Sequence, residues 1–322
     1  MRVLVSPLNM NRRIISMFTK EKLIESIKKT ILFKKFKKTF YQTSEKNYVK
    51  PILDDLSCDI LLKKLLLSDR PCMISRLGST ELKTMEYHYK KKEYSKSLKY
   101  IMKNNAGVYP IDTISLNKFS KLYFEKISNI DLLGIWFNPF EDIIANKFCS
   151  NAKLTLLKNL EPYFSDSPWS SYLKGKKVLV IHPFVSSLEF QYNKRNQLFE
   201  NKNILPRFEF IPYKAVQSIG GNDDFDSWFD ALDHMQNDIK KIDFDIAIIG
   251  AGAYGLPLAS FVKEIGKKSI HLGGATQMLF GVYGQRWKID PNFNDIINEH
   301  WIQPSEDEKP NNAHKVENAC YW

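Results

Sequence analysis

The segment 250–255, Gly-Ala-Gly-Ala-Tyr-Gly, carries the clearest chemical signal in this sequence. Glycines allow a sharp turn and let a ligand approach the main chain closely. A helix that starts there offers unpaired N–H groups and a partial positive charge, which together favour a phosphate. A nucleotide diphosphate is therefore the expected ligand, although such a turn can also join a strand to a helix with no ligand. The residues that would cradle it are Gly250, Gly252, Tyr254 and Gly255.

A second candidate lies earlier, in the segment 76–81, Arg-Leu-Gly-Ser-Thr-Glu, where a strand enters a helix. A carboxylate held there by Glu81 could act as a general base or as a metal ligand. With Gly78 as the N-cap, however, Glu81 would be the third helical residue, so capping the helix is a competing structural role. Both interpretations remain open from the sequence.

Cations and amides complete the set of candidate residues. Arg286 follows a glycine-rich turn, and Arg76 precedes Gly78; either could balance the charge of a bound diphosphate, or serve as a structural ion-pair partner. Lys194 and Arg195 could contact phosphates, or could simply be solvated on a helix surface. Further candidates for contacting or positioning the nucleotide ligand are Ser79, Gly274 and Gln277, and Asp224 and Asp226 are alternative bases.

These residues sit at the ends of predicted strands. Short apolar runs rich in β-branched residues predict strands at 244–249, 268–272, 72–77, 132–137, 177–182 and 208–213. Helices are predicted at 59–67, 79–89, 115–127, 188–199, 225–241 and 256–265, and the segment from residue 153 is predicted to begin with a helix. The alternation predicts an α/β fold: a Rossmann-like, mostly parallel sheet flanked by helices, whose carboxyl edge binds the ligand.

The glycine spacing also matches the dinucleotide fingerprint G-x-G-x-x-G. That fingerprint needs an Asp or Glu about 20 residues later to hold a ribose. Here the next strand ends in His271, Leu272 and Gly273, without a carboxylate, and the motif lies late in the chain. An NAD(P)-dependent oxidoreductase is therefore the less favoured alternative.

Composition is that of a globular protein with a strong basic bias. The 322 residues are 43% hydrophobic and 26% charged, with a net charge of +11 and a pI near 9.2. Four cysteines without a C-x-x-C pair favour a reducing cytoplasm over a disulfide framework. We expect three parts: a basic N-terminal extension at 1–50, a catalytic domain at 51–302, and a tail at 303–322 that docks on the domain.

The N-terminal extension suggests a membrane surface. Phe33, Phe36 and Phe40 recur at helical spacing with lysines between them, which is typical of a basic amphipathic helix that binds anionic lipids. The same helix could instead pack on its own domain. Nucleic acid is not expected as a partner, because no recognised binding motif accompanies the lysines. Neither a signal peptide nor a spanning segment is predicted, so the expected location is the cytoplasm, peripheral to the inner face of the membrane.

Four segments together resemble bacterial glycosyltransferases of the GT-D type fold. They are 76–81, the strand at 178–182 with the helix carrying Gln191, the turn 250–255, and the run from Gly273 to Trp287. The resemblance covers roughly residues 71–287. It implies a Rossmann-like domain that binds a nucleotide-sugar donor, with Glu81 matching a catalytic and metal-binding glutamate. Ser79 stands where that family has an aspartate, which removes one oxygen ligand and puts an Mn²⁺ or Mg²⁺ site in doubt.

The function expected from this resemblance is glycosyl transfer. A sugar would move from a nucleotide-diphosphate donor to a glycan or lipid-linked acceptor in surface polysaccharide biosynthesis. A non-catalytic nucleotide-sugar-binding protein is the alternative that the serine at position 79 keeps open. The apolar, aromatic end of the chain, 316–322, is expected to dock near the site.

Overall fold

The computed structural model describes residues 45–221 and 224–322. The chain divides into two compact units, Met1–Val49 and Lys50–Trp322, and every element below belongs to the second. The predicted amphipathic helix with its three phenylalanines lies outside the described residues. The extents of the extension, the domain and the tail therefore stay predictions.

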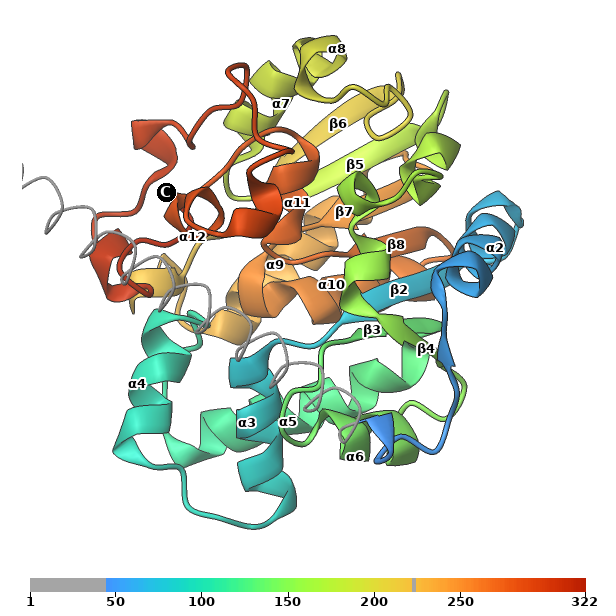
Figure 1. Cartoon of the computed structure of the whole chain (residues 1–322). Helices are drawn as coiled ribbons and strands as arrows, with labels where there is room; N and C mark the ends of the chain where they lie inside the picture. Colours follow the sequence, from blue (N-terminus) through green and yellow to red (C-terminus); the bar gives the residue numbers. More distant parts are fainter. Residues whose placement is uncertain (1–44, 222–223) are drawn as a thin grey trace, which may run out of the picture. The chain divides into compact units, whose positions relative to one another are not determined.

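An eight-stranded sheet forms the centre of the second unit (Figure 1). Every pair of neighbouring strands is parallel, and the order across the sheet is β1-β4-β3-β2-β8-β7-β5-β6. The strands are β1 (Ile52–Leu53), β2 (Cys72–Arg76), β3 (Leu132–Ile135), β4 (Lys153–Leu156), β5 (Lys177–His182), β6 (Glu209–Lys214), β7 (Ile246–Ile249) and β8 (Lys268–His271).

Helices cover the sheet, as the predicted α/β class requires. They are α2 (Asp55–Leu67), α3 (Ser79–Tyr89), α4 (Lys96–Asn104), α5 (Thr113–Lys126), α6 (Glu141–Lys147), α7 (Val185–Asn193), α8 (Arg195–Leu198), α9 (Trp228–Ile239), α10 (Gly255–Glu264), α11 (Ala275–Leu279) and α12 (Gln285–Lys288). The predicted fold class, a Rossmann-like parallel sheet flanked by helices, is confirmed.

Both faces of the central strands are buried, which explains why these strands read as continuous apolar runs. Alternate residues such as Ile74, Val180 and Ile248 join one large core with side chains of α2, α7 and α11. Helix α10 packs against β2, β7 and β8, and α5 packs against α10 and α3. Apolar burial on two faces thus fixes the register of the sheet that positions the site.

The chain changes direction between β5 and β7. Strand β5 is followed by its outer neighbour β6, whereas β7 is followed by β8 on the opposite side. The connections after β5 and β7 therefore run in opposite directions, and in open α/β sheets ligands bind beside such a switch point, outside the carboxyl ends of the strands.

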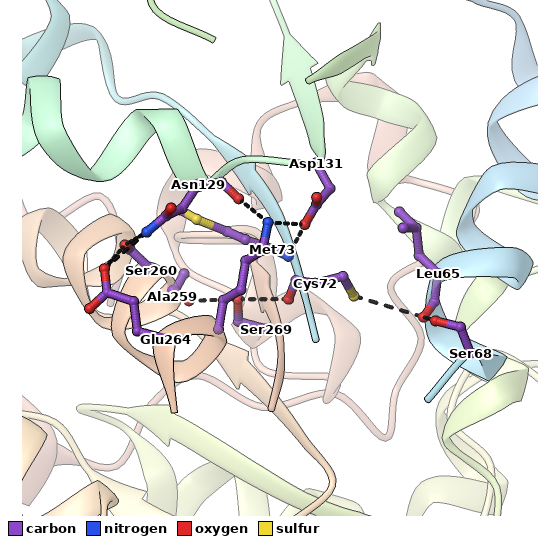
Figure 2. Close-up of polar contacts among 11 residues, drawn as sticks. Leu65, Ser68, Cys72, Met73, Asn129, Asp131, Ala259, Ser260, Glu264 and Ser269 are labelled. Carbon is purple, nitrogen blue, oxygen red and sulfur yellow. Dashed lines mark hydrogen bonds and ion pairs between the residues drawn. The ribbon is translucent and has the colours of Figure 1, made fainter. Parts of the chain in front are cut away.

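A network of polar contacts joins the elements at the amino edge of the sheet (Figure 2). Asp131, just before β3, accepts hydrogen bonds from the backbone N–H of Met73 and from Lys263 Nζ, both at 2.7 Å. Asn129 donates to Ser260 Oγ and to Glu264 at the end of α10. Each donor in this network meets an acceptor, so the network joins β2, β3 and α10 without leaving a charge uncompensated.

Two expectations about local structure were wrong. The segment from residue 153 is not a helix but strand β4, because Leu154 and Thr155 pair with β3 on one side and β1 on the other; tertiary pairing outweighs a spacing that also suits a helix. The predicted helix at 188–199 starts earlier, at Val185, and breaks at Lys194 into α7 and α8. No helix in the described ranges is long and apolar enough to cross a membrane.

Candidate active site

The two glycine-containing corners lie at the same edge of the sheet. A Cβ on Gly273, after β8, would stand 2.9 Å from Arg76 Nη1, and a Cβ on Gly250, after β7, would stand 2.8 Å from the carbonyl oxygen of Gly273. The corner after β2 and the turn after β7 are thus connected through the turn after β8. The edge where the carboxyl ends of β2, β8 and β7 meet is the candidate site.

Buried histidines explain two of the three fingerprint glycines. A Cβ on Gly250 would lie 2.5 Å from His182 Cδ2, and one on Gly255 would lie 2.4 Å from His271 Nε2. Burial lowers the pKa of each histidine to about 3, and the charge of Arg76 adds to that effect at His271. Both rings are therefore neutral packing elements, and the glycines make room for them.

The turn itself uses several of its own N–H groups. The backbone N–H of Gly250 donates to Ile181, that of Tyr254 to Ala251, and that of Gly255 to Gly252. Gly252 differs, since it is exposed, has φ +51° and has open space where a Cβ would be. A phosphate cradle at this turn would therefore centre on Gly252 rather than on Tyr254 or Gly255.

The side chain of Tyr254 belongs to the core. Its ring stacks on Trp228 with a centroid distance of 4.8 Å, and its hydroxyl pairs with Ser218 Oγ at 2.8 Å. Burial raises the pKa of the Tyr254 hydroxyl well above its ordinary value of 10. Only its backbone can face the site.

Arg76 is the electrostatic centre of the site. Its guanidinium lies 4.8 Å from the centroid of the Trp136 ring, a cation–π contact, and its Nε is buried without a hydrogen-bond partner among the described residues. Its charge influences titratable side chains that come from different parts of the chain: Glu81, Tyr123, Glu161, His271 and Tyr321. A half-buried cation with a buried, unused donor is suited to an anionic ligand.

Glu81 takes the capping position that its spacing allows. It is the third residue of α3, whose N-cap is Gly78, and a Cβ on Gly78 would overlap its carboxylate, at 1.8 Å from Oε2. Burial raises the pKa of Glu81, while a hydrogen bond from its own backbone N–H and the charge of Arg76 oppose the rise. The carboxylate is thus folded back on the helix start, beside the exposed Ser79.

A second carboxylate near Arg76 was missed from the sequence. Glu161 follows the 3₁₀ helix η2 (Leu157–Leu160) after β4. Burial raises its pKa to about 7; the Tyr163 hydroxyl and the charge of Arg76 oppose the rise, and Asp290 adds to it. No motif surrounds Glu161 in the sequence, and its place in the site depends on β4 lying two strands from β2.

The end of the chain contacts the turn after β8. Gln277 Nε2 donates to the carbonyl oxygen of Tyr321 at 3.2 Å, and a Cβ on Gly274 would lie 2.9 Å from the Tyr321 ring. Trp322 is buried and lies against Phe184, with 5.5 Å between ring centroids. Three further buried polar atoms here lack a partner among the described residues: Thr276 Oγ1, Gln277 Oε1 and Trp322 Nε1.

Arg286 reaches this region through Tyr321. Its guanidinium lies 5.2 Å from the centroid of the Tyr321 ring and 5.4 Å from that of Trp287. The charges of both Arg286 and Arg76 act on the Tyr321 hydroxyl, against the rise in its pKa that burial causes. The charges of the two predicted arginines thus both act on one tyrosine.

Lys194 and Arg195 do not join these residues. They follow α7, whose last turn lies at the amino edge, since the hydroxyl of Tyr192 accepts from and donates to Phe208 just before β6. Lys194 lies over the exposed ring of Phe190 at 4.1 Å, and Arg195 over Tyr192 at 5.2 Å. Their predicted phosphate contacts would require a ligand at the far end of α7.

The start of α7, beside the switch point, is occupied by the chain itself. The buried carboxylate of Glu308 accepts hydrogen bonds from the backbone N–H groups of Ser186, at 2.9 Å, and Ser187, and from the Ser187 hydroxyl. A helix start after a central strand can hold a phosphate. Here it holds Glu308, so the candidate position for an anionic ligand lies instead at the ends of β7, β8 and β2.

The residues present do not by themselves fit a divalent cation. Residues 45–221 and 224–322 contain no group of three or more His, Cys, Asp or Glu side chains placed to hold a metal ion. Glu81 is the one predicted ligand at the corner after β2, and Ser79 replaces the expected second carboxylate.

Fold and site together define a Rossmann-like α/β protein with a cationic, carboxylate-containing site at the carboxyl edge of a parallel sheet. No protein-family model matches the sequence. A curated protein, the lysine-specific histone demethylase 1B homolog of Caenorhabditis elegans, is 31% identical over 147 residues, which amount to 42% of this chain and 17% of that protein. The chain therefore spans less than a fifth of that relative's length.

Among solved structures, the chain is similar to a domain of unknown function 1792, solved in selenomethionine-substituted form. The two share 12% sequence identity with a TM-score of 0.44, over 74% of this chain and 83% of that one. Neither similarity assigns the chain to a family.

Proposed function

We propose that this protein is a glycosyltransferase that uses a nucleotide-diphosphate sugar as donor and a glycan or lipid-linked molecule as acceptor. The observation that carries the proposal is the half-buried Arg76, whose Nε is a buried and unused donor and whose charge acts on nearby carboxylates. A leaving diphosphate needs cationic stabilisation, and an acceptor hydroxyl needs a base. Both kinds of group meet at the carboxyl edge of the sheet.

In the reaction, the acceptor oxygen forms a bond to the anomeric carbon of the sugar. The bond from that carbon to the diphosphate oxygen breaks, and its electron pair leaves with the diphosphate. Arg76 would compensate the growing negative charge, with Arg286, beside Tyr321, as a second cation. A carboxylate of the site would take the proton of the acceptor hydroxyl, and from the sequence Glu81 is the candidate.

The donor would lie along the turns after β7 and β8. Gly252 allows the diphosphate to approach the backbone, because no side chain stands near it. Buried polar atoms of Thr276 and Gln277 still lack partners among the described residues and could bind the donor. The proposed place at the cytoplasmic face of a membrane rests on the N-terminal sequence alone.

Ligand screening tests the proposal. The full chain is heated with UDP-, GDP-, CDP- and dTDP-linked sugars and, separately, with NAD⁺ and NADP⁺. A ligand present at 100 times its Kd stabilises the folded state by about 2.7 kcal/mol. We expect stabilisation by a nucleotide sugar and release of its nucleoside diphosphate when an acceptor is added. Stabilisation by NAD⁺ or NADP⁺ alone would reject the proposal, and donor binding without hydrolysis or transfer would favour a binding protein.

A further inference from the structure

We infer that the indole ring of Trp136 is the surface on which the sugar of the donor stacks, so that the carboxyl end of β3 forms the sugar subsite. This inference rests on the proposed function and adds one specificity-determining residue to it. It follows from the contacts that fix the ring, from two buried donors that lack partners, and from the order of the strands.

The Trp136 ring is held in place although it is exposed. The residue directly follows β3 and is 37% exposed. Its Nε1–H donates to the carbonyl oxygen of Leu77 at 3.0 Å, and the guanidinium of Arg76 lies 4.8 Å from the ring centroid. A ring that is already fixed loses little conformational freedom when a ligand binds it, so its exposed surface is well suited to binding.

The segment that carries this ring has a costly backbone conformation. The buried carboxylate of Glu141 accepts hydrogen bonds from the backbone N–H groups of Trp136, at 3.0 Å, and Asn138, at 3.3 Å. Phe137 and Phe140 have positive φ angles of 61° and 72°, which side chains other than glycine rarely adopt. Such strain persists only where the surroundings impose it, and it is concentrated at functional sites. The conformation therefore points to a role for the exposed ring of this segment.

Two buried donors belong to this corner and to this segment: Nε of Arg76 and Nδ2 of Asn138. Neither has a partner among the described residues. An unpaired buried donor is costly, and a ligand that brings an acceptor would offset that cost. A sugar supplies both kinds of surface that are needed here, because its C–H groups can lie against the negative face of an indole while its oxygens accept hydrogen bonds. A phosphate could satisfy the donors but has no apolar face to cover the ring.

The order of the strands assigns this subsite to the sugar rather than to the nucleotide. Strands β3, β2, β8 and β7 are successive neighbours in the sheet, and the diphosphate is proposed to lie along the turns after β7 and β8. Arg76 connects the two regions: a Cβ on Gly273, after β8, would lie 2.9 Å from its Nη1, and its guanidinium contacts the Trp136 ring, after β3. Because the diphosphate links nucleoside and sugar, a donor whose diphosphate lies beside Arg76 has its sugar at the end of β3.

Equilibrium binding separates the sugar from the rest of the donor. The full chain is titrated by calorimetry with the nucleotide sugar that stabilises it most and, separately, with the corresponding nucleoside diphosphate. We expect Trp136→Leu to raise the Kd of the nucleotide sugar about five- to tenfold and to change that of the nucleoside diphosphate by less than about twofold. Trp136→Phe, which keeps an aromatic ring, should have a smaller effect. The matched control is Phe190→Leu, because that ring is 51% exposed and contacts a cation, Lys194, at 4.1 Å outside the site.

The outcomes separate this inference from the proposed function. If Trp136→Leu binds the nucleotide sugar as wild type does, the inference is wrong and the transferase proposal stands. An equal rise in Kd for both ligands would also overturn it, because the ring would then act only by positioning Arg76. An unchanged donor Kd with a raised KM for the acceptor would assign the ring to the acceptor instead. If wild type binds no nucleotide sugar, the proposed function itself fails, and this role falls with it. Thermal unfolding of each variant establishes that it is folded.

Discussion

The two edges of the sheet treat their charged groups in opposite ways. At the amino edge, Asp131 is matched by a backbone N–H and by Lys263, and Glu264 by Asn129 (Figure 2). At the carboxyl edge, Arg76 keeps a buried donor without a partner among the described residues, and the carboxyls of Glu81 and Glu161 have raised pKa values. The first edge serves stability, and the second holds groups whose partners would come with a ligand.

In a parallel sheet, the polar groups at one end of the strands can thus be fully hydrogen-bonded while those at the other end keep unpaired donors and acceptors. Asp245, just before β7, has the same role as Asp131 in the other half of the sheet. Its carboxylate accepts a hydrogen bond of 2.8 Å from the backbone N–H of Lys177, the first residue of β5. Aspartates at strand starts thus satisfy the backbone, so the strand ends can carry groups that are costly to bury.

Replacing Arg76 should show the largest functional effect and little loss of stability. Arg76→Met removes a half-buried cation whose buried Nε has no partner among the described residues, so the free energy of unfolding should be unchanged or higher by about 1 kcal/mol. Turnover of the nucleotide sugar should fall about 10²- to 10³-fold, equivalent to about 3–4 kcal/mol of transition-state stabilisation. Urea unfolding and steady-state kinetics measure the two effects, with the exposed Arg70→Met as control. A large loss of stability with normal turnover would reverse the assignment of the two edges.

Replacing Asp131 should do the opposite. Asp131→Ala leaves the Met73 N–H and the Lys263 ammonium without their acceptor, which should lower the free energy of unfolding by about 2–3 kcal/mol. Donor binding and turnover of the folded fraction should stay normal. The control is Asp243→Ala, which removes an ion pair from a side chain that is 75% exposed and should cost much less. Equal losses in the two variants would contradict the role given to the amino edge.

Stability should depend on pH through Glu161. Its folded pKa, about 7, lies above its ordinary 4.5, so its contribution to stability is fully present below about pH 4.5 and is lost as the pH rises through 7. Wild type should therefore lose up to about 2 kcal/mol more than Glu161→Gln between these values, after allowance for partial solvent access. Urea midpoints of both proteins at pH 4.5, 6 and 7.5 measure this, and parallel curves would show that Glu161 titrates normally.

Alanine at Gly252 should have the smallest effect. The added Cβ meets nothing, and only the positive φ of +51° resists it, so the free energy of unfolding should fall by about 1 kcal/mol. Gly255→Ala is the comparison, because its Cβ would press on the buried ring of His271 and should cost more. Calorimetry of both variants measures the two losses of stability. A larger loss for Gly255→Ala would show that packing against His271 requires a glycine at position 255.

Much of the fold followed from the sequence because the central strands are buried on both faces. The apolar runs at β2, β5 and β7 have no other stable environment, and a turn residue follows each strand: Gly78 after β2, Pro183 after β5 and Gly250 after β7. Strand β4 escaped prediction because its four residues have no such pattern and depend on pairing with β3 and β1.

The site was less predictable than the fold. Arg76 and Glu81 are five residues apart in the same strand-to-helix segment, so their proximity could be predicted from the sequence. Glu161 could not, since only strand order brings a residue 85 positions from Arg76 to the same edge. The glycine fingerprint misled in detail, because Gly250 and Gly255 accommodate histidines that lie far away in the sequence.

Glu308 gives the start of α7 a built-in competitor. A carboxylate tethered to the same chain is present at an effective concentration far above that of a free metabolite. A ligand phosphate could take this helix start only by displacing it, together with the hydrogen bond from the backbone N–H of Ser305 to Ser187. Replacing Glu308 would therefore free the backbone N–H groups at the start of α7 to bind an external anion.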